Sequence, residues 1–293
     1  MGQKTNSTIA HLSLKNSDWD LKYIEKNKEE SSLFVYKNIK IIDYLNKIFN
    51  QYGFIMHTCK IKSTNTSAVF IIFLVEKRLE TVKFYSNNLK DLKLNKQTIG
   101  TKHLLINNNN LINFIANHIL SIGLNLFLKT QSITIKIHNL NKNFESKLVS
   151  SKSKTIEYQK LLKIFRPFLK NNFNKELLKL LFIAVSERNS AKLIAETINL
   201  YFVNQKKRHG FGLFFFKKVL SALIVSNFSK IRGTKIVIAG RINGAPRANK
   251  KILKIGTVPL QSFNLPINYY ESTAFTSNGT FGIKVWVCDA KKH

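Results

Sequence analysis

Residues 233–287 constrain the fold of this chain more than any other segment. They begin with a β-branched run, residues 233–240, that is typical of a strand and ends in a glycine. A glycine turn and several cations follow in residues 241–254, and the segment closes with a glycine-punctuated run ending at Trp286 and Val287. The pattern predicts a small β-sheet that holds cations on its loops, an arrangement suited to phosphate contacts.

The charge of the chain indicates a polyanionic partner. Its 293 residues include 47 Lys and Arg against 16 Asp and Glu, which gives a formal net charge of +31. Such a field attracts nucleic acid first and an anionic membrane surface second. Only seven of the cations are arginines, and lysine makes point-charge contacts whereas arginine forms the fork that reads bases. We therefore expect neutralisation of the phosphate backbone and little reading of base sequence.

Other features argue against an enzyme, a metal protein and a membrane protein. An apolar fraction of 44% supports packed cores, and the length suggests two modest domains. Cys59 and Cys288 form neither a disulfide framework nor a metal-ligand spacing, and His57 with Cys59 is interpreted as one face of a strand. There is no phosphate-binding G-x-x-x-x-G-K-[ST] motif and no convincing catalytic constellation, so we expect no catalysis, metal or cofactor. We also expect no membrane association, with residues 155–186 as the only candidate for an amphipathic membrane helix.

The first half of the chain is interpreted as an arm followed by a small domain. Residues 1–35 form a polar N-terminal arm. In residues 36–140 the sequence predicts, in chain order, a helix at 38–52, strands at 54–62 and 68–76, a weakly helical polar stretch up to Lys96, a helix at 111–122 and a strand at 132–138. This order is that of a KH domain of the prokaryotic type (type II), which holds single strands with a GxxG loop. No glycine occurs between Gly53 and Gly100, so we expect a degenerate KH-like domain without the standard grip.

The second half is interpreted as an insertion followed by a C-terminal domain. Residues 141–186 contain a basic linker, SKLVSSKSKT, and amphipathic helices at 161–169 and 177–185. We expect a solvated, lineage-specific insertion, and the alternative is a docking surface for another protein. In residues 187–293, Ser190 is expected to cap a first helix, the phenylalanines at 214–216 are expected in the core, and two helices should cover a small sheet. The predicted fold class is α+β.

Basic residues cluster at two places in the C-terminal domain, near the turn between its helices and in the loop after residue 240. Together with one lysine of the arm, they are the candidate RNA contacts: Lys4, Lys206, Lys207, Arg208, Lys217, Lys218, Arg241, Arg247, Lys250, Lys251 and Lys254.

Several segments resemble one family. They are similar to motifs of the small-subunit ribosomal protein three family, in an organellar form. The similar segments are the opening MGQKTN, the DWD at residues 18–20, NIKIIDYLNKIF, AKLIAETI, IVIAGRINGA, TVPL and GIKVWV. Lys217 and Lys218 fall on a basic pair of its second C-terminal helix. A further basic residue of the family, one turn on, corresponds to Ser221, and the arginine before Val-Pro-Leu corresponds to Thr257.

The resemblance implies a structural, non-catalytic role. Members of this family bind ribosomal RNA in the head of the small subunit, line the mRNA entry channel and contact head proteins ten and fourteen; they are not homo-oligomers. The composition, rich in Lys, Asn, Ile and Phe, is typical of an AT-rich organelle genome, and we expect a mitochondrial protein made inside the organelle. The alternative is a free-standing organellar RNA chaperone or intron-splicing cofactor.

Overall fold

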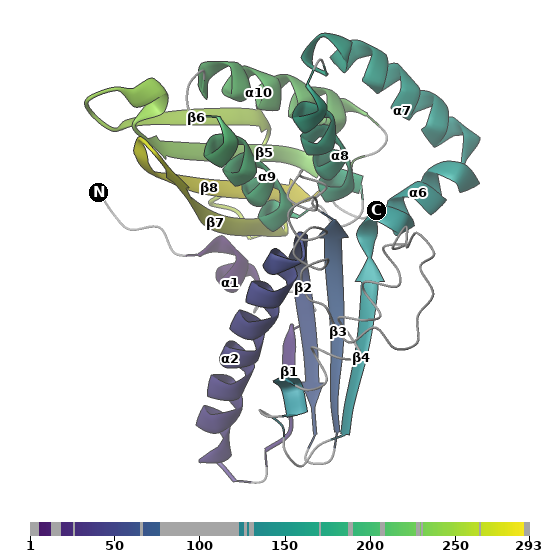
Figure 1. Cartoon of the computed structure of the whole chain (residues 1–293), viewed down its shortest axis with the longest axis vertical. Coiled ribbons are helices and arrows are strands. Elements are labelled where there is room, and N and C mark those ends of the chain that lie inside the picture. Colours follow the sequence, from purple (N-terminus) through teal and green to yellow (C-terminus); the bar gives the residue numbers. More distant parts are fainter. Residues whose placement is uncertain are drawn as a thin grey trace, which may run out of the picture. The chain divides into compact units, whose positions relative to one another are not determined.

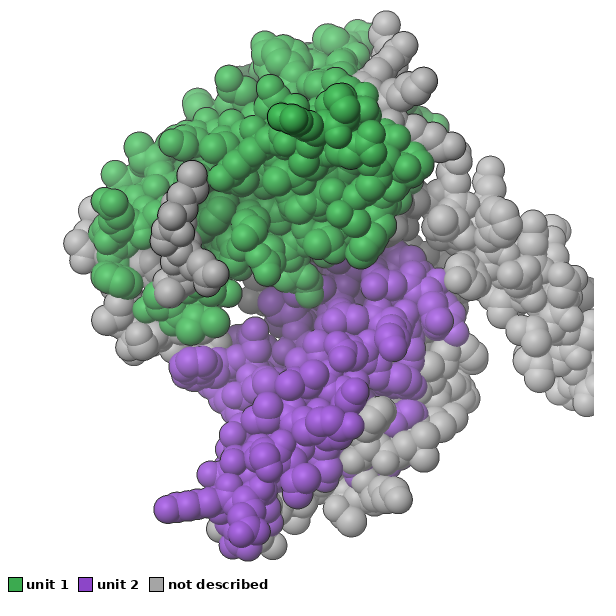
Figure 2. All heavy atoms as spheres, turned by 90° about the vertical axis from the view of Figure 1, so that its left-hand side faces the viewer, with its two compact units in different colours: residues 1–17, 141–293 green, residues 18–140 purple. Residues whose placement is uncertain are grey.

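The chain forms two compact units that each combine helices with a β-sheet. The computed structural model describes residues 6–12, 19–25, 27–64, 67–76, 123–125, 128, 132–169, 171–186, 190–205, 209–226, 229, 231–263 and 265–289. One unit comprises residues 18–140, and the other comprises residues 1–17 with residues 141–293 (Figure 2). The predicted α+β class is confirmed. The helix predicted at 111–122 lies outside the described residues.

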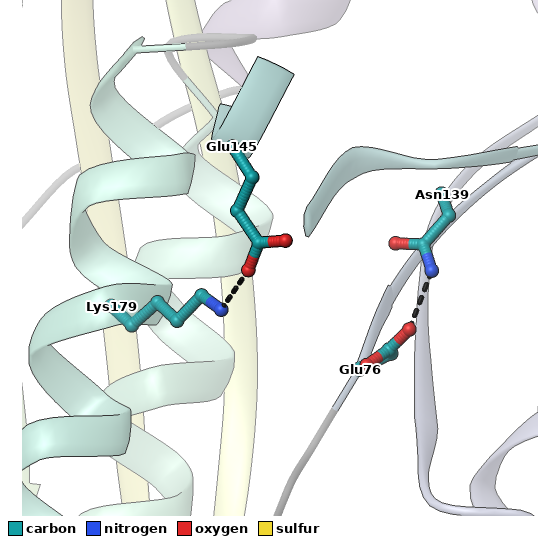
Figure 3. Close-up of polar contacts among 4 residues, drawn as sticks. All are labelled: Glu76, Asn139, Glu145 and Lys179. Atoms are coloured by element: carbon teal, nitrogen blue, oxygen red, sulfur yellow. Dashed lines mark hydrogen bonds and ion pairs between the residues drawn. The ribbon is translucent and has the colours of Figure 1, made fainter. Parts of the chain in front are cut away.

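The unit of residues 18–140 contains a four-stranded sheet in the order β1-β2-β3-β4 (Figure 1). Its strands are β1 (Leu21–Tyr23), β2 (Phe54–Ser63), β3 (Ser67–Glu76) and β4 (Ser132–Asn139). β2 and β3 are antiparallel, whereas β1 pairs with β2 and β4 pairs with β3 in parallel. Where β3 and β4 end, the Asn139 side-chain amide donates to a Glu76 carboxylate oxygen over 2.5 Å (Figure 3).

Helix α2 (Glu30–Gln51) packs on one face of this sheet. Its buried residues recur at helical spacing, and they are Asn38, Ile41, Leu45, Ile48 and Phe49. The predicted helix began at residue 38 because the apolar periodicity begins there. In the two turns before it, side chains such as Leu33, which is 59% exposed, face solvent. The sequence there lacks the apolar periodicity of a half-buried helix, so the start of the helix was not predicted. The three predicted strands are confirmed, and the KH-type arrangement stays a prediction.

The second unit contains an antiparallel sheet in the order β6-β5-β8-β7. Its strands are β5 (Ile231–Gly240), β6 (Asn249–Gly256), β7 (Ile267–Thr276) and β8 (Gly279–Asp289). Helices α9 (Ala191–Asn204) and α10 (His209–Val225) cover one face, as predicted (Figure 1). The Ser190 hydroxyl caps α9 by accepting from the Leu193 amide over 3.2 Å. Phe215 and Phe216 are buried as expected, whereas Phe214 is half-exposed.

The prediction of a basic linker at residues 146–155 is wrong. Its residues belong to two helices, α6 (Leu140–Ser150) and α7 (Lys152–Phe165), separated only by Ser151. Tertiary packing overrides the low helix propensity of the serines, because Leu140 and Phe144 are buried. Lys179 donates to Glu145 over 2.6 Å and ties α6 to α8 (Asn172–Ser186) (Figure 3).

The expectation of a solvated insertion is also wrong for α8. Leu181, Phe182 and Ile183 are fully buried, and the Phe182 ring contacts those of Phe144 and Tyr158. The apolar face of α8 is thus part of the core of this unit, which removes it as a surface for a membrane. Among the residues that the structure describes, no helix combines the length and apolarity needed to cross a bilayer.

The N-terminal arm contributes to both units. In α1 (Ser7–Leu12), the Thr8 hydroxyl accepts from the Tyr269 amide over 2.8 Å and donates to the Tyr269 carbonyl over 3.3 Å. These bonds attach α1 to the edge of β7. β1, by contrast, extends the sheet of residues 18–140.

Candidate nucleic-acid interface

The basic loop after β5 is attached to the start of α10 by a pair of reciprocal hydrogen bonds. The His209 backbone N–H donates to the Asn243 side-chain oxygen over 2.8 Å, and the Asn243 backbone N–H donates to His209 Nδ1 over 3.0 Å. Because Nδ1 accepts, Nε2 carries the proton and donates to the Gln205 carbonyl over 2.9 Å. His209 is fully buried against Phe202 and Phe281. Neither His209 nor Asn243 was among the predicted site residues.

The loop itself has a fixed shape. In η3 (Ile242–Gly244), Asn243 and Gly244 have φ values of 57° and 76°, in the left-handed region that asparagine and glycine tolerate best. The Arg241 guanidinium Nε donates to the Ala245 carbonyl over 2.8 Å and closes the turn. Arg241 and Arg247 are both exposed, so the loop presents two cations to solvent from a constrained backbone.

Lys217 and Lys218 lie on the exposed side of α10. At a rise of 1.5 Å per residue they stand roughly 12–14 Å along the helix from His209. Lys218 Nζ lies 5.4 Å from the centroid of the half-exposed Phe214 ring. One turn further on, the Ser221 hydroxyl donates to the Lys218 carbonyl over 2.8 Å, so this position adds no cation to the helix surface.

Three of the predicted loop cations lie on a strand, which corrects the expectation that they sit on a loop. Lys250, Lys251 and Lys254 belong to β6, an edge strand paired with β5. Successive strand residues point to opposite faces, so the three lysines are divided. Lys251 shares a face with Ile238, which is buried under the helices, whereas Lys250 and Lys254 lie on the opposite face. All three are exposed.

The face of this sheet opposite α9 and α10, here called the helix-free face, carries two more lysines that were not predicted from the sequence. Lys235 pairs directly with Lys254, and its Nζ lies 5.2 Å from the Trp286 ring centroid. Lys284 is 3.7 Å from the Glu271 carboxylate on the next strand. The alternation of residues 231–240 already places Lys235 opposite the buried isoleucines, and this signal could have identified it.

An arginine outside the predicted set lies near the Val-Pro-Leu segment. Arg232 Nε donates to the Thr257 hydroxyl over 2.9 Å. A guanidinium is therefore held beside the position that corresponds to an arginine in the family that the sequence resembles.

On the helix-free face, burial and then the hydrogen bond and charge of Glu271 raise the pKa of Tyr269 to about 12. This phenol therefore stays protonated in the physiological pH range.

Four predicted contacts cannot be placed. Lys4, Lys206, Lys207 and Arg208 lie outside the described residues.

His57 and Cys59 are both buried in β2, and within the described part of the chain no three His, Cys, Asp or Glu side chains gather as metal ligands would.

Comparison with known proteins places these cations in a family context. Residues 214–287 match the family described as "Ribosomal protein S3, C-terminal domain". Small ribosomal subunit protein uS3c of Euglena longa is 33% identical over 161 residues, which cover 52% of this chain and 69% of the relative. The chain belongs to the ribosomal protein S3 family. The matched segment contains Lys217 and Lys218 together with every predicted cation of the 241–254 segment.

Two further members of the S3 family show the extent of the similarity. uS3c of Psilotum nudum is 34% identical over 161 residues, which cover 55% of this chain and 60% of the relative. uS3 of Karelsulcia muelleri is 34% identical over 119 residues, which cover 41% and 51%. The chain therefore spans about half to two thirds of the length of these S3 proteins.

Proposed function

We propose that this chain is a structural constituent of the small subunit of the mitochondrial ribosome. In this role it binds ribosomal RNA in the subunit head, lines the mRNA entry channel and catalyses no reaction. The observation that supports the proposal most strongly is that the segment matching the S3 family also carries the constrained, exposed cations of α10, the 241–247 loop and β6. We propose that small-subunit head proteins ten and fourteen are its neighbours.

The geometry suits contact with phosphates. Lys217, Arg241 and Lys251 come from a helix, a loop and a strand, and the His209–Asn243 bonds join the loop to the helix. The backbone that carries these cations is already ordered, so binding needs no folding of the loop, and each neutralised phosphate releases counterion. Lys4 and Lys206–Arg208 are proposed as further contacts.

Two aspects of the proposal rest on the sequence. The mitochondrial location rests on an amino-acid composition, rich in Lys, Asn, Ile and Phe, that is typical of AT-rich organelle genomes. The relatives described above are a bacterial uS3 protein and uS3c proteins. The part of the chain at the entry channel is proposed to be α10, through Lys217 and Lys218. Ser221 supplies no third cation there, so we propose a channel wall with two cations on this helix.

Sedimentation of the tagged protein from an organelle lysate tests the proposal. At both low and high salt, we expect sharp co-migration with the small ribosomal subunit. A broad distribution at low salt that collapses to free protein at high salt would instead indicate a free-standing RNA chaperone or splicing cofactor.

A further inference from the structure

The sheet of residues 18–140 has a second face that no described element covers. α2 packs on the face that contains Cys59, Ile61, Phe70 and Ile72. The opposite face is built from the alternate residues of the same strands, in three cross-strand rows. The register gives these rows as Thr58–Phe73–His138, Lys60–Ile71–Lys136 and Lys22–Lys62–Val69–Thr134.

Aromatic rings lie on this face. Phe73 and His138 are register partners, and their rings stack with centroids 5.1 Å apart and planes inclined by 21°. Trp19 is 55% exposed, and the bond from the Ile61 amide to the Asp20 carbonyl, 2.8 Å long, holds its neighbour against β2. A hollow of about 340 Å³ is lined by Trp19, Phe73, His138 and lysines of β1 and β2. This volume lies within the range of roughly 300–1,000 Å³ typical of ligand sites.

Lysines surround these rings. The rows contribute Lys22, Lys60, Lys62 and Lys136, whereas Asp20 is the one carboxylate among the described residues that line the hollow. Lys22 and Lys62 are register partners on neighbouring parallel strands, so this face places two lysines side by side. The combination of cations with accessible rings matches the requirements of a single strand, whose bases stack while its phosphates meet lysines.

We propose that this face binds a short segment of single-stranded RNA. Bases stack on Trp19 and on the His138–Phe73 pair, and the phosphates are neutralised by lysines that include Lys62 and Lys136. The sequence has no GxxG loop for the usual grip of a KH domain, and the face that no described element covers would supply an independent one. The inference goes beyond the proposed ribosomal role and depends on it only in naming RNA as the nucleic acid.

Fluorescence anisotropy of the full-length chain with a fluorescein-labelled hexauridylate tests the proposal. We expect Lys62→Glu with Lys136→Glu, and separately Trp19→Ala with His138→Ala, to weaken binding by about tenfold or more, given the usual cost of losing a stacked base. The matched control is Lys37→Glu with Lys47→Glu, two exposed lysines of α2 in the same unit. It makes the same change in net charge on the other side of the sheet. Thermal unfolding establishes that each variant is folded.

Intrinsic fluorescence separates stacking from general attraction. The chain has two tryptophans, and Trp286 is only 9% exposed, so quenching by hexauridylate should come from Trp19 and disappear in Trp19→Ala. Equal losses in the α2 control, or full affinity in both face variants, would overturn the proposal. It would also be overturned if the face variants kept RNA affinity but failed to enter small subunits, because that result indicates a protein partner. Failure of the ribosomal role would appear only in sedimentation, so the two outcomes are distinct.

Discussion

His209 and Asn243 each donate a backbone N–H to the side chain of the other, over 2.8 and 3.0 Å, although 34 positions separate them in the chain. The pair fixes the basic loop of residues 241–247 to the first turn of α10. It also satisfies two backbone groups, one at the helix start and one in a left-handed turn. The loop and the helix therefore behave as one rigid support for their cations.

The first prediction concerns this pair. Asn243→Gly removes the side-chain acceptor but tolerates the φ of 57°, whereas Asn243→Ala removes the acceptor and adds backbone strain. We expect a loss in the free energy of unfolding of about 1–2 kcal/mol for Gly and roughly 1 kcal/mol more for Ala. Urea denaturation measures both. An Ala variant as stable as the Gly variant would show that the turn does not hold this backbone conformation in solution.

Regular patterns in the sequence predicted most of the fold. The strands at 54–62, 68–76 and 132–138 were predicted because β-branched and aromatic residues alternate there, and each lies within an observed strand. The Ser190 cap was recognisable because a serine before an apolar helical run has few other roles. These signals are local, so they needed no knowledge of the rest of the molecule.

What the sequence did not predict depends on contacts between distant segments. Residues 146–155 resemble a linker by composition, and they are helical because buried residues on either side, such as Phe144, pack against α8. His209 could not be recognised, since its partner Asn243 lies on another element. The division of Lys250, Lys251 and Lys254 between two faces required the register with β5.

The second prediction concerns the basic pair of α10. Changing Lys217 and Lys218 to Glu should impair mRNA handling more than subunit assembly, because these exposed side chains are proposed to face the entry channel. A toeprinting assay measures mRNA engagement, and sucrose gradients measure assembly. The matched control is Lys160→Glu with Lys163→Glu, two exposed lysines of α7. An assembly defect of equal size would place Lys217 and Lys218 on ribosomal RNA instead.

The third prediction concerns the attachment of the insertion to α10. The Asn174 side-chain amide of α8 donates to the Phe168 carbonyl over 2.9 Å, and Phe168 in η2 (Arg166–Phe168) contacts the rings of Phe211 and Phe215. Asn174→Ala leaves this carbonyl without the amide, so we expect a loss of about 1–3 kcal/mol in the free energy of unfolding. The exposed Asn143→Ala on α6 should change it by no more than about 0.5 kcal/mol. Equal effects in urea denaturation would contradict a structural role for Asn174.

The fourth prediction concerns the response to salt. Binding through lysine–phosphate contacts releases counterions, so the affinity for isolated ribosomal RNA should fall steeply with ionic strength. Each cation that contacts a phosphate contributes a slope of about −0.7 to −0.9 in log affinity against log salt. Lys250→Ala with Lys254→Ala should therefore reduce the steepness of this slope by about 1.4–1.8 if both lysines contact RNA. Filter binding at several salt concentrations measures it, and an affinity insensitive to salt would exclude the phosphate mechanism.

The fifth prediction concerns alkaline pH. Burial, followed by the charge of Glu196, raises the pKa of Tyr270 to about 12 from its ordinary 10.0. Above pH 10 the unfolded chain ionises this phenol while the folded chain still binds the proton, so folding stability is retained below pH 10 and lost as the pH rises through 12. Tyr270→Phe cannot ionise and should lose less stability over the same interval.

Lysines also lose their charge in this range, which eases repulsion within a chain of +31 and acts in the opposite direction. Because the wild type and Tyr270→Phe share those lysines, the difference between their urea midpoints at pH 9, 10 and 11 isolates the phenol. The two midpoints should diverge as the pH rises, with the variant falling more slowly. Parallel curves would show that Tyr270 is solvated in the native state, and the packing of α9 against β7 around this ring would then need revision.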